Sequence, residues 1–377
     1  MEYLQYEYLR EGVTMSRNTT YQEDLPENGL LTSMLIRMSA AGVSGAFAAV
    51  HKWRISDFID KIEIIGNGSE VIKSLTGNCL QGIMEIDNGG FPIDYWQSYA
   101  TGTKRFHVML TFGRQLFDKL YGLDLSKWDN VQIKITNSAT STQLGEDISL
   151  SMLCFYWRGD ITSFAGYIRT EEWRKWDTVS NEIKYLEMPT EHLIRRILMQ
   201  VYPDQDANFL DESNMFNYAW DVELSLKTGQ LRVFKGGTDD LARLNAIQMK
   251  NLAYSFPNYY CTADKGRYVG IGYVLGSALA PGSKSGTTPA VIPGIENNSS
   301  NSTQKPEVYT ADEPFGAIHA GYCPENMLFL PFNFTDDLNG YLDPKENEAV
   351  KLNIQTRSGA SYADGEIRIV LERLVLR

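Results

Sequence analysis

The residues of this chain that could bind a metal ion are scattered rather than grouped. Its four histidines are His51, His107, His192 and His319, and none of them forms an HxH pair. A metal-dependent enzyme needs clustered imidazoles together with a carboxylate. The sequence therefore predicts no metal site and no cofactor. His107 lies within an apolar strand pattern, and we interpret it as a packing or interface residue.

Adjacent acidic residues occur at Glu171-Glu172, Asp239-Asp240 and Asp336-Asp337. Two carboxyl groups that face each other across a cleft would support glycoside hydrolysis. Neighbours on a strand point to opposite faces, however, and the acids at 239 and 240 suit the first turn of a helix. We interpret all three pairs as solvated or capping residues. The sequence therefore predicts no catalytic residues and a protein that is not an enzyme.

Two further motifs favour structural roles. Gly66-Asn67-Gly68 superficially resembles a phosphate-binding loop, but no GK[ST] or GxGxxG helix start follows it. Its context, IEIIGNGSEVI, predicts a β-hairpin with Asn67-Gly68 at the bend. The four cysteines lie far apart without a CxxC pair, so we expect buried free thiols, with a disulfide as the alternative. They are Cys79, Cys154, Cys261 and Cys323.

The strand pattern of this chain occurs twice along the sequence. Apolar residues alternate with polar ones from Val131 to Ile135, and again from Ile148 to Met152 after a twelve-residue gap. Both stretches recur 219 residues later with the same gap, at Val350 to Ile354 and Ile367 to Leu371. Period-two alternation is typical of half-buried strands, and the equal spacing indicates a repeat of one domain.

An earlier hairpin pattern supports the repeat. The stretch from Ile62 to Ile72 resembles the stretch from Val222 to Val233, and each is followed by a threonine in the position of a helix N-cap, Thr76 and Thr238. Many short strands separated by Gly, Asn and Asp turns are typical of jelly rolls. The predicted fold is all-β, with two tandem eight-stranded jelly rolls and short helices in the connecting loops.

The predicted domains are an N-terminal arm at 1–30, a first jelly roll at 31–175 and a second at 176–377. We expect the arm to serve assembly rather than either jelly roll. The second domain contains a predicted exposed loop at about 276–306. In the 31 residues from Gly276 to Pro306, 20 are Gly, Ser, Thr, Asn or Pro. Such a segment buries too little apolar surface to fold alone, so we expect it to face outward.

Composition excludes some partners. The chain has 377 residues, 43% of them hydrophobic and 22% charged, and a formal net charge of −12. Residues 1–30 hold six acids against two arginines. Phosphate binding draws on clustered Lys and Arg, so we expect no sequence-specific nucleic-acid binding. No apolar run approaches the roughly 20 residues that span a bilayer, and the start lacks a signal-peptide pattern, so we expect no Sec-type export.

Longer phrases of the sequence resemble a known family. The phrases are LPENGLLTSMLIRMSA, DFIDKIEIIGNGSEVIKSLTGNCLQ, YGLDLSKWDNVQIKITN and YLEMPTEHLIRRILMQVYP. They resemble stretches of the double jelly-roll major capsid proteins of icosahedral bacterial and archaeal viruses, the PRD1-adenovirus-like lineage. The resemblance covers most of residues 25–255 and the chain from about 325 onward.

The resemblance implies a structural role. It implies a major capsid protein that forms homotrimers, each a pseudo-hexamer of six jelly rolls, which tile an icosahedral virion over an internal membrane. It also implies contacts with neighbouring capsomers, penton and minor capsid proteins, and contact with the inner membrane through the N-terminal arm. The protein would be made in the host cytoplasm and end in the virion. The alternative is a glycan-binding or glycan-cleaving protein built from two jelly rolls.

Overall fold

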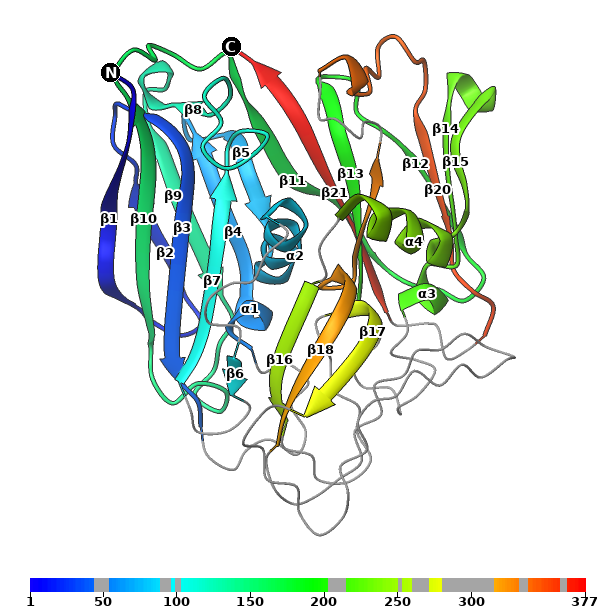
Figure 1. Cartoon of the computed structure of the whole chain (residues 1–377), viewed down its shortest axis with the longest axis horizontal. Coiled ribbons are helices and arrows are strands. Elements are labelled where there is room, and N and C mark those ends of the chain that lie inside the picture. Colours follow the sequence, from blue (N-terminus) through cyan, green and yellow to red (C-terminus); the bar gives the residue numbers. More distant parts are fainter. Residues whose placement is uncertain are drawn as a thin grey trace. The chain divides into compact units, whose positions relative to one another are not determined.

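The chain divides into two compact, strand-rich units (Figure 1). The computed structural model describes residues 1–43, 54–88, 96–98, 103–202, 215–249, 253–259, 271–279, 315–331, 338–359 and 365–377. Unit 1 comprises Met1–Glu171 together with Glu372–Arg377, and unit 2 comprises Glu172–Leu371. The predicted all-β fold class is confirmed.

Unit 1 has two layers of four main strands. The first layer has the order β1-β10-β3-β7, and the second has the order β2-β9-β4-β5. The first-layer strands are β1 (Tyr3–Met15), β10 (Ile148–Arg158), β3 (Leu30–Ala41) and β7 (Thr103–Thr111), with the short β8 (Leu123–Asp124) also paired to β3. The second-layer strands are β2 (Thr20–Asp24), β9 (Val131–Asn137), β4 (Ile59–Gly66) and β5 (Glu70–Leu75).

Unit 2 repeats this topology with later strands. Its first layer has the order β11-β21-β13-β19, and its second has the order β12-β20-β14-β15. The strands of the first are β11 (Gly166–Asp177), β21 (Glu366–Leu376), β13 (Leu193–Tyr202) and β19 (Met327–Pro331). The segments Gly166–Glu171 of β11 and Glu372–Leu376 of β21 belong to unit 1. Those of the second are β12 (Ile183–Glu187), β20 (Lys351–Gln355), β14 (Asp221–Leu226) and β15 (Leu231–Gly237). The matching orders confirm the repeat that the spacing predicts.

Short helices and additional strands connect these layers. The helices are α1 (Ile55–Phe58), α2 (Gly77–Asn88), α3 (Met215–Tyr218) and α4 (Thr238–Met249), with 3-10 turns at Leu125–Lys127, Lys227–Gly229 and Leu338–Gly340. The remaining strands are β6 (Trp96–Ser98), β16 (Ala253–Tyr259), β17 (Ile271–Leu279) and β18 (Phe315–Pro324). No helix in the described ranges is long and apolar enough to cross a membrane.

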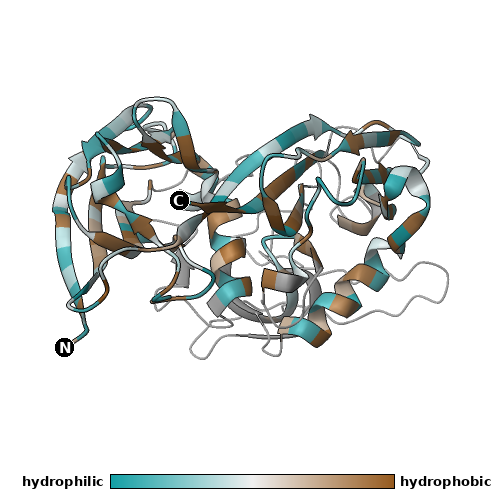
Figure 2. Cartoon of the chain, turned by 90° about the horizontal axis from the view of Figure 1, so that it is seen from above, coloured by the Kyte–Doolittle hydropathy of each residue, from teal (hydrophilic) through white to brown (hydrophobic). Residues whose placement is uncertain are grey.

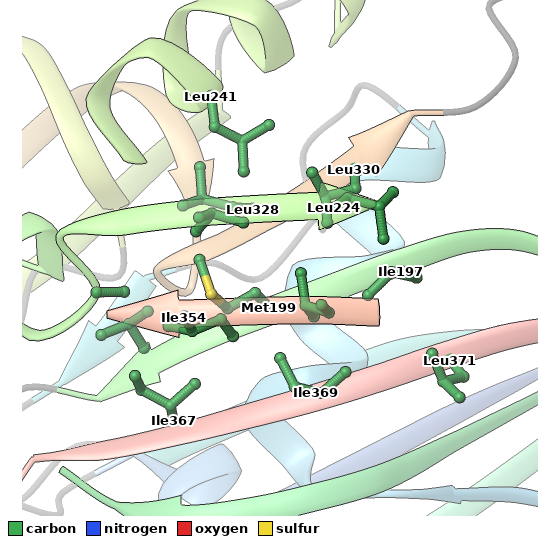
Figure 3. Close-up of a cluster of buried hydrophobic side chains, with 14 of the residues drawn as sticks. Ile197, Met199, Leu224, Leu241, Leu328, Leu330, Ile354, Ile367, Ile369 and Leu371 are labelled. Carbon is green, nitrogen blue, oxygen red and sulfur yellow. The ribbon is translucent and has the colours of Figure 1, made fainter. Parts of the chain in front are cut away.

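Each unit buries apolar side chains between its two layers. In unit 1, Ile133 and Ile135 of β9 and Met34 and Ile36 of β3 are fully buried. In unit 2, side chains of β21, β13 and β14 join one cluster, which Leu241 of α4 also enters (Figure 3). Apolar and polar residues alternate along the strands (Figure 2). This period of two directs one face of each strand into the core.

The predicted hairpin at Asn67-Gly68 is confirmed. Both residues have positive φ, 50° and 74°, and the Ser69 N–H donates to the Gly66 carbonyl over 3.2 Å. Two positive φ angles define the turn whose twist matches that of the flanking strands. Residues of this sequence type, Asn and Gly, adopt such angles at the lowest cost.

The two threonines that precede the repeated helices have different roles. Thr76 is confirmed as an N-cap, because its hydroxyl oxygen accepts a hydrogen bond from the Cys79 N–H over 3.4 Å. Thr238 is not a cap, and this prediction is wrong. It is the first residue of α4, it is buried, and its hydroxyl donates to the Ala219 carbonyl.

The structure differs from the predicted domain boundaries. Residues 1–30 are not an arm outside the jelly roll, because β1 pairs with β10 and β2 pairs with β9 inside unit 1. The units divide after Glu171, and β21 carries the last six residues back into unit 1. Long-range backbone pairing decides these boundaries, and local residue composition does not report it. Of the predicted loop at 276–306, positions 276–279 belong to β17, and the rest lies outside the described residues.

Deleting residues 1–24 should therefore destabilise the folded chain. The deletion removes two strands and the buried Met15, and it leaves β9 and β10 as bare edges. We expect the thermal midpoint, followed by circular dichroism, to fall by more than about 5 °C. Deleting only Met1 and Glu2, which precede β1, is the control and should cost little, because exposed ion pairs contribute little. An unchanged midpoint for the longer deletion would contradict the strand assignment.

Repeat-equivalent core positions should respond alike to truncation. Ile135 and Ile354 lie 219 residues apart and are both buried, so Ile135→Ala and Ile354→Ala should each lower the free energy of unfolding by about 2–5 kcal/mol. Partly exposed lysines of the same two strands provide controls. Lys134→Ala in β9 and Lys351→Ala in β20 should each change the free energy of unfolding by about 0.5 kcal/mol or less. Chemical denaturation measures all four. A cost confined to one unit would argue against equivalent cores.

Candidate functional site

The three described histidines lie in or beside different strands. His107 is in β7, His192 directly precedes β13, and His319 in β18 is paired in register with Ser255 of β16. His51 lies outside the described residues. Within the described ranges, no three His, Cys, Asp or Glu side chains gather into a group that could hold a metal ion.

The adjacent acids Glu171 and Glu172 form ion pairs with arginines of their own units. Glu171 in unit 1 pairs with Arg373 and with Arg169, the latter at 2.8 Å, and its side chain is only 14% exposed. This carboxylate is therefore part of a partly buried pair rather than solvated. Glu172 in unit 2 lies 3.8 Å from Arg368.

The acids at 239 and 240 lie in the first turn of α4, where they complement the helix dipole. Arg243 reaches both of them, over 3.4 Å to Asp239 and 2.9 Å to Asp240. These side chains are largely exposed, as expected for a solvated pair. Residues 336 and 337 lie outside the described residues. Each carboxylate of the described acidic pairs is therefore engaged by an arginine.

Three cysteines are buried free thiols, as the sequence predicts: Cys79, Cys154 and Cys323. Burial raises the pKa of Cys154 to about 11, with a smaller contribution from the nearby charge of Glu7. Burial also raises the pKa of Cys323. The thiolate is the nucleophilic form, so these environments suppress reactivity. Cys261 lies outside the described residues.

A buried polar cluster fixes the helices of unit 1. The Asp57 carboxylate accepts from the Arg54 guanidinium and from the Asn78 amide, each over 3.0 Å. Burial opposes ionisation of Asp57, but these donors outweigh it and hold its pKa below the usual range. Burial lowers the pKa of the fully buried Lys104 to about 8, and the charge of Asp57 opposes that shift. The cluster links α1 to α2 by hydrogen bonds and an ion pair, so we interpret it as structural.

The end of the chain closes unit 1 along β5. The Arg377 guanidinium lies 3.7 Å from the ring centroid of Trp128 and donates to Glu70 over 2.5 Å. The Tyr167 hydroxyl donates to the same carboxylate over 2.8 Å. Burial opposes ionisation of Glu70, but Arg377 and Tyr167 hold its pKa below the usual range. These contacts hold β11 beside β5.

The ends of several strand layers are covered by groups that replace a neighbouring strand. At the β19 end, the Asn245 side chain accepts from the Phe329 N–H over 2.8 Å and donates to its carbonyl over 2.7 Å. At the β7 end, the Met109 N–H points to the sulfur of Met84 in α2 at 3.2 Å. At the β5 end, β11 pairs in parallel through Thr170.

The strands β1 and β15 end their layers without such a neighbour in the described part of the chain. None of the seven β15 residues is buried, whereas four of the six β5 residues are. In β1 only Met15 is buried. The strand β1 cannot be recognised from its own residues, YLQYEYLREGVTM, because they lack clean alternation of apolar and polar side chains. Its position before β2, matching that of β11 before β12, is the signal that would have identified it.

The buried thiols should stay unreactive in the folded protein. In a Cys261→Ser variant, which leaves three cysteines, we expect almost no reaction with Ellman's reagent at pH 8 and three equivalents after unfolding in guanidinium. Colour development at 412 nm, a property of the reagent, gives the count. Rapid reaction of a full equivalent under native conditions would contradict the burial of these side chains.

No family model and no curated protein sequence matches this chain. Solved structures do match it. The STIV MCP has a TM-score of 0.61 and 13% identity, with 99% of this chain and 97% of that chain covered. The major capsid protein P2 from bacteriophage PM2 has a TM-score of 0.54 and 10% identity, with 100% and 99% covered. The PBCV-1 virus capsid has a TM-score of 0.59 and 9% identity, with 99% and 94% covered. This chain therefore has the double jelly-roll fold found in these capsid structures.

Proposed function

We propose that this chain is a major capsid protein, the structural subunit of an icosahedral virion. The observation that carries the proposal is the likeness of the whole chain, both jelly rolls included, to capsid structures that it also covers almost completely. The repeated strand order supports it from inside the chain, because the two units have the same two-layer topology. The acidic residues and cysteines discussed above are consistent with this role, because they form ion pairs and hydrogen bonds or are buried in the core.

The duplication suits a trimer that tiles a shell. A homotrimer has threefold symmetry, whereas a closely packed layer of blocks is best served by six similar sides. Two equivalent jelly rolls in each chain supply six such sides per trimer, which makes the block a pseudo-hexamer. The contacts between copies would be large, because obligate assemblies bury more than roughly 2,000 Å².

The proposed partners follow from this role. Each trimer would contact neighbouring capsomers and, at special positions of the shell, penton and minor capsid proteins. The net charge of −12 opposes a direct grip on a nucleic-acid genome. The location would be the virion capsid, after synthesis in the host cytoplasm, with an internal membrane beneath the shell. Contact of residues 1–30 with that membrane stays a prediction, and β1 and β2, as strands of unit 1, would make it from the folded jelly roll rather than from a separate arm.

Purified protein should form trimers in solution. We expect a molar mass of three times 42.6 kDa by size-exclusion chromatography with light scattering, and blocks of hexagonal outline in negative-stain electron micrographs. A stable monomer at micromolar concentration would contradict the proposal. Glycan-array binding at micromolar affinity tests the alternative. Specific binding that is lost on changing exposed aromatic residues would show that a shell subunit is not the whole function.

A further inference from the structure

The two units differ in which ends of their layers are covered. The ends at β2 and β12 are equivalent, and both lack a neighbour among the described strands. The strands β5 and β15 are also equivalent, but β11 covers only β5. The strands β1 and β11 are the third equivalent pair, since each pairs with the last long strand of its unit, β10 or β21. The neighbour that covers β5 is thus the counterpart of β1.

The repeat aligns β1 with β11 from Tyr3 to Tyr8, after which the register of β1 against β10 first shifts. Arg158 and Arg377 occupy the same position of the repeat, 219 residues apart. Tyr3 of β1 lies opposite Arg158, and the carbonyl of Ala165, directly before β11, accepts a hydrogen bond from the Arg377 N–H over 3.0 Å. Tyr3 therefore corresponds to Ala165.

The hairpins align β5 with β15 in the same way. Glu63 of β4 and Glu223 of β14 are equivalent residues of the repeat. Glu63 lies opposite Ser74, and Glu223 lies opposite Lys235. Both hairpins also have a register shift at the same place, between Ile64 and Ile65 in β4 and between Leu224 and Ser225 in β14. Ser74 therefore corresponds to Lys235.

We propose that β1 of one copy of this chain pairs in parallel with β15 of a second copy. Inside the chain, Glu171 of β11 is paired in parallel with Ser74 of β5. The neighbouring pair, Thr170 with Lys73, has as its counterpart Tyr8 of one copy beside Phe234 of the next, which brings Leu9, at the register shift of β1, next to Lys235. The contact between copies would thus repeat a strand pairing that the chain already makes within unit 1, and this inference rests on the proposed capsid function.

Exposure at the two edges supports this occupant. On β1, Tyr3 and Tyr6 are 52% and 69% exposed, and on β15, Leu231 and Val233 are 51% and 42% exposed. The strand β5, which has its neighbour, shows the contrasting buried pattern. Unpaired strand edges with apolar side chains are sites at which another strand adds to a sheet.

The charges of the two strands are complementary. The exposed acids of β1 are Glu7 and Glu11, and its one cation, Arg10, pairs with Glu23 of β2. The strand β15 has no acid and carries Arg232 and Lys235, whose side chains are 60% and 58% exposed and which pair with Glu223. Opposite charges across an interface favour the correct partner and its orientation.

The contact also has the symmetry that a ring requires. It joins unit 1 of one copy to unit 2 of the next, so it is heterologous, and each copy added leaves one edge of each kind free. Such contacts satisfy every edge only when they close into a ring. In a ring of three copies, two kinds of strand contact would alternate around the axis. The β5–β11 pairing lies within each copy, and the β1–β15 pairing lies between one copy and the next.

Disulfide trapping tests the pairing. Leu9→Cys and Lys235→Cys, combined in one chain with Cys261→Ser, would place thiols on strands about 4.8 Å apart, which is within reach of a disulfide. We expect mild oxidation to give covalent dimers and trimers on non-reducing gels, reversed by dithiothreitol. The matched control combines Leu9→Cys with Tyr185→Cys on β12, where the side chain is 72% exposed but the edge is not part of the proposed contact. That variant should stay monomeric on the gel.

The result separates this inference from the capsid function. Trimers by light scattering together with a covalent ladder in the Leu9–Lys235 variant alone would support the pairing. Trimers that give no ladder, or equal ladders in both variants, would overturn the β1–β15 contact while the capsid function stands. Protein that is monomeric at all concentrations would overturn both.

Charge reversal provides a second measurement that does not depend on thiol geometry. Arg232→Glu with Lys235→Glu should raise the trimer dissociation constant by at least about tenfold, and adding Glu7→Lys with Glu11→Lys should recover most of the loss. Lys345→Glu, an exposed reversal outside both strands, is the control for Lys235→Glu alone, because each changes the net charge by the same amount. Equal effects of Lys345→Glu and Lys235→Glu, or no recovery, would count against the proposed pairing.

Discussion

The covering of strand edges is the constraint on which the rest of this structure depends. A strand at the end of a layer leaves backbone N–H and C=O groups without partners, and burial of such groups is costly. The chain meets this requirement with a different device at each end. Asn245 replaces a strand beside β19, the sulfur of Met84 lies beside β7, and a whole strand, β11, lies beside β5.

The last of these devices explains why unit 1 contains the end of the chain. Glu171 and Glu70 sit on neighbouring strands, and each carboxylate is held by an arginine from the final residues, Arg373 and Arg377. Removing one member of such a partly buried pair leaves an uncompensated charge, which is far more costly than losing an exposed pair. The stacking of Arg377 over Trp128 adds apolar and cation–π contact at the same point. The C-terminus is therefore a structural part of the first jelly roll.

The same topology applied twice has unequal consequences. The strand β11 both covers β5 and begins the second jelly roll, whereas no equivalent strand in the described part of the chain covers β15 or the outer edge of β1. An open edge on each unit is the expected result of a tandem repeat whose units pair in sequence. In a shell subunit this becomes useful, since heterologous edges can close a ring of copies. Fold, duplication and proposed assembly thus share one physical origin.

The sequence by itself determined the repeat, the strand type and the first hairpin. Alternation around Ile133 and around Leu352, its counterpart in the repeat, has a period of two because one face of each strand is buried. The bend at Asn67 depends only on local backbone preference. Only the tertiary structure decided that β1 and β2 belong to unit 1, that Thr238 starts a helix without capping it, and which edges are covered. Those outcomes depend on partners outside the local sequence, 19 residues away for Thr238 and in another strand, β10, for β1, and local composition carries no record of them.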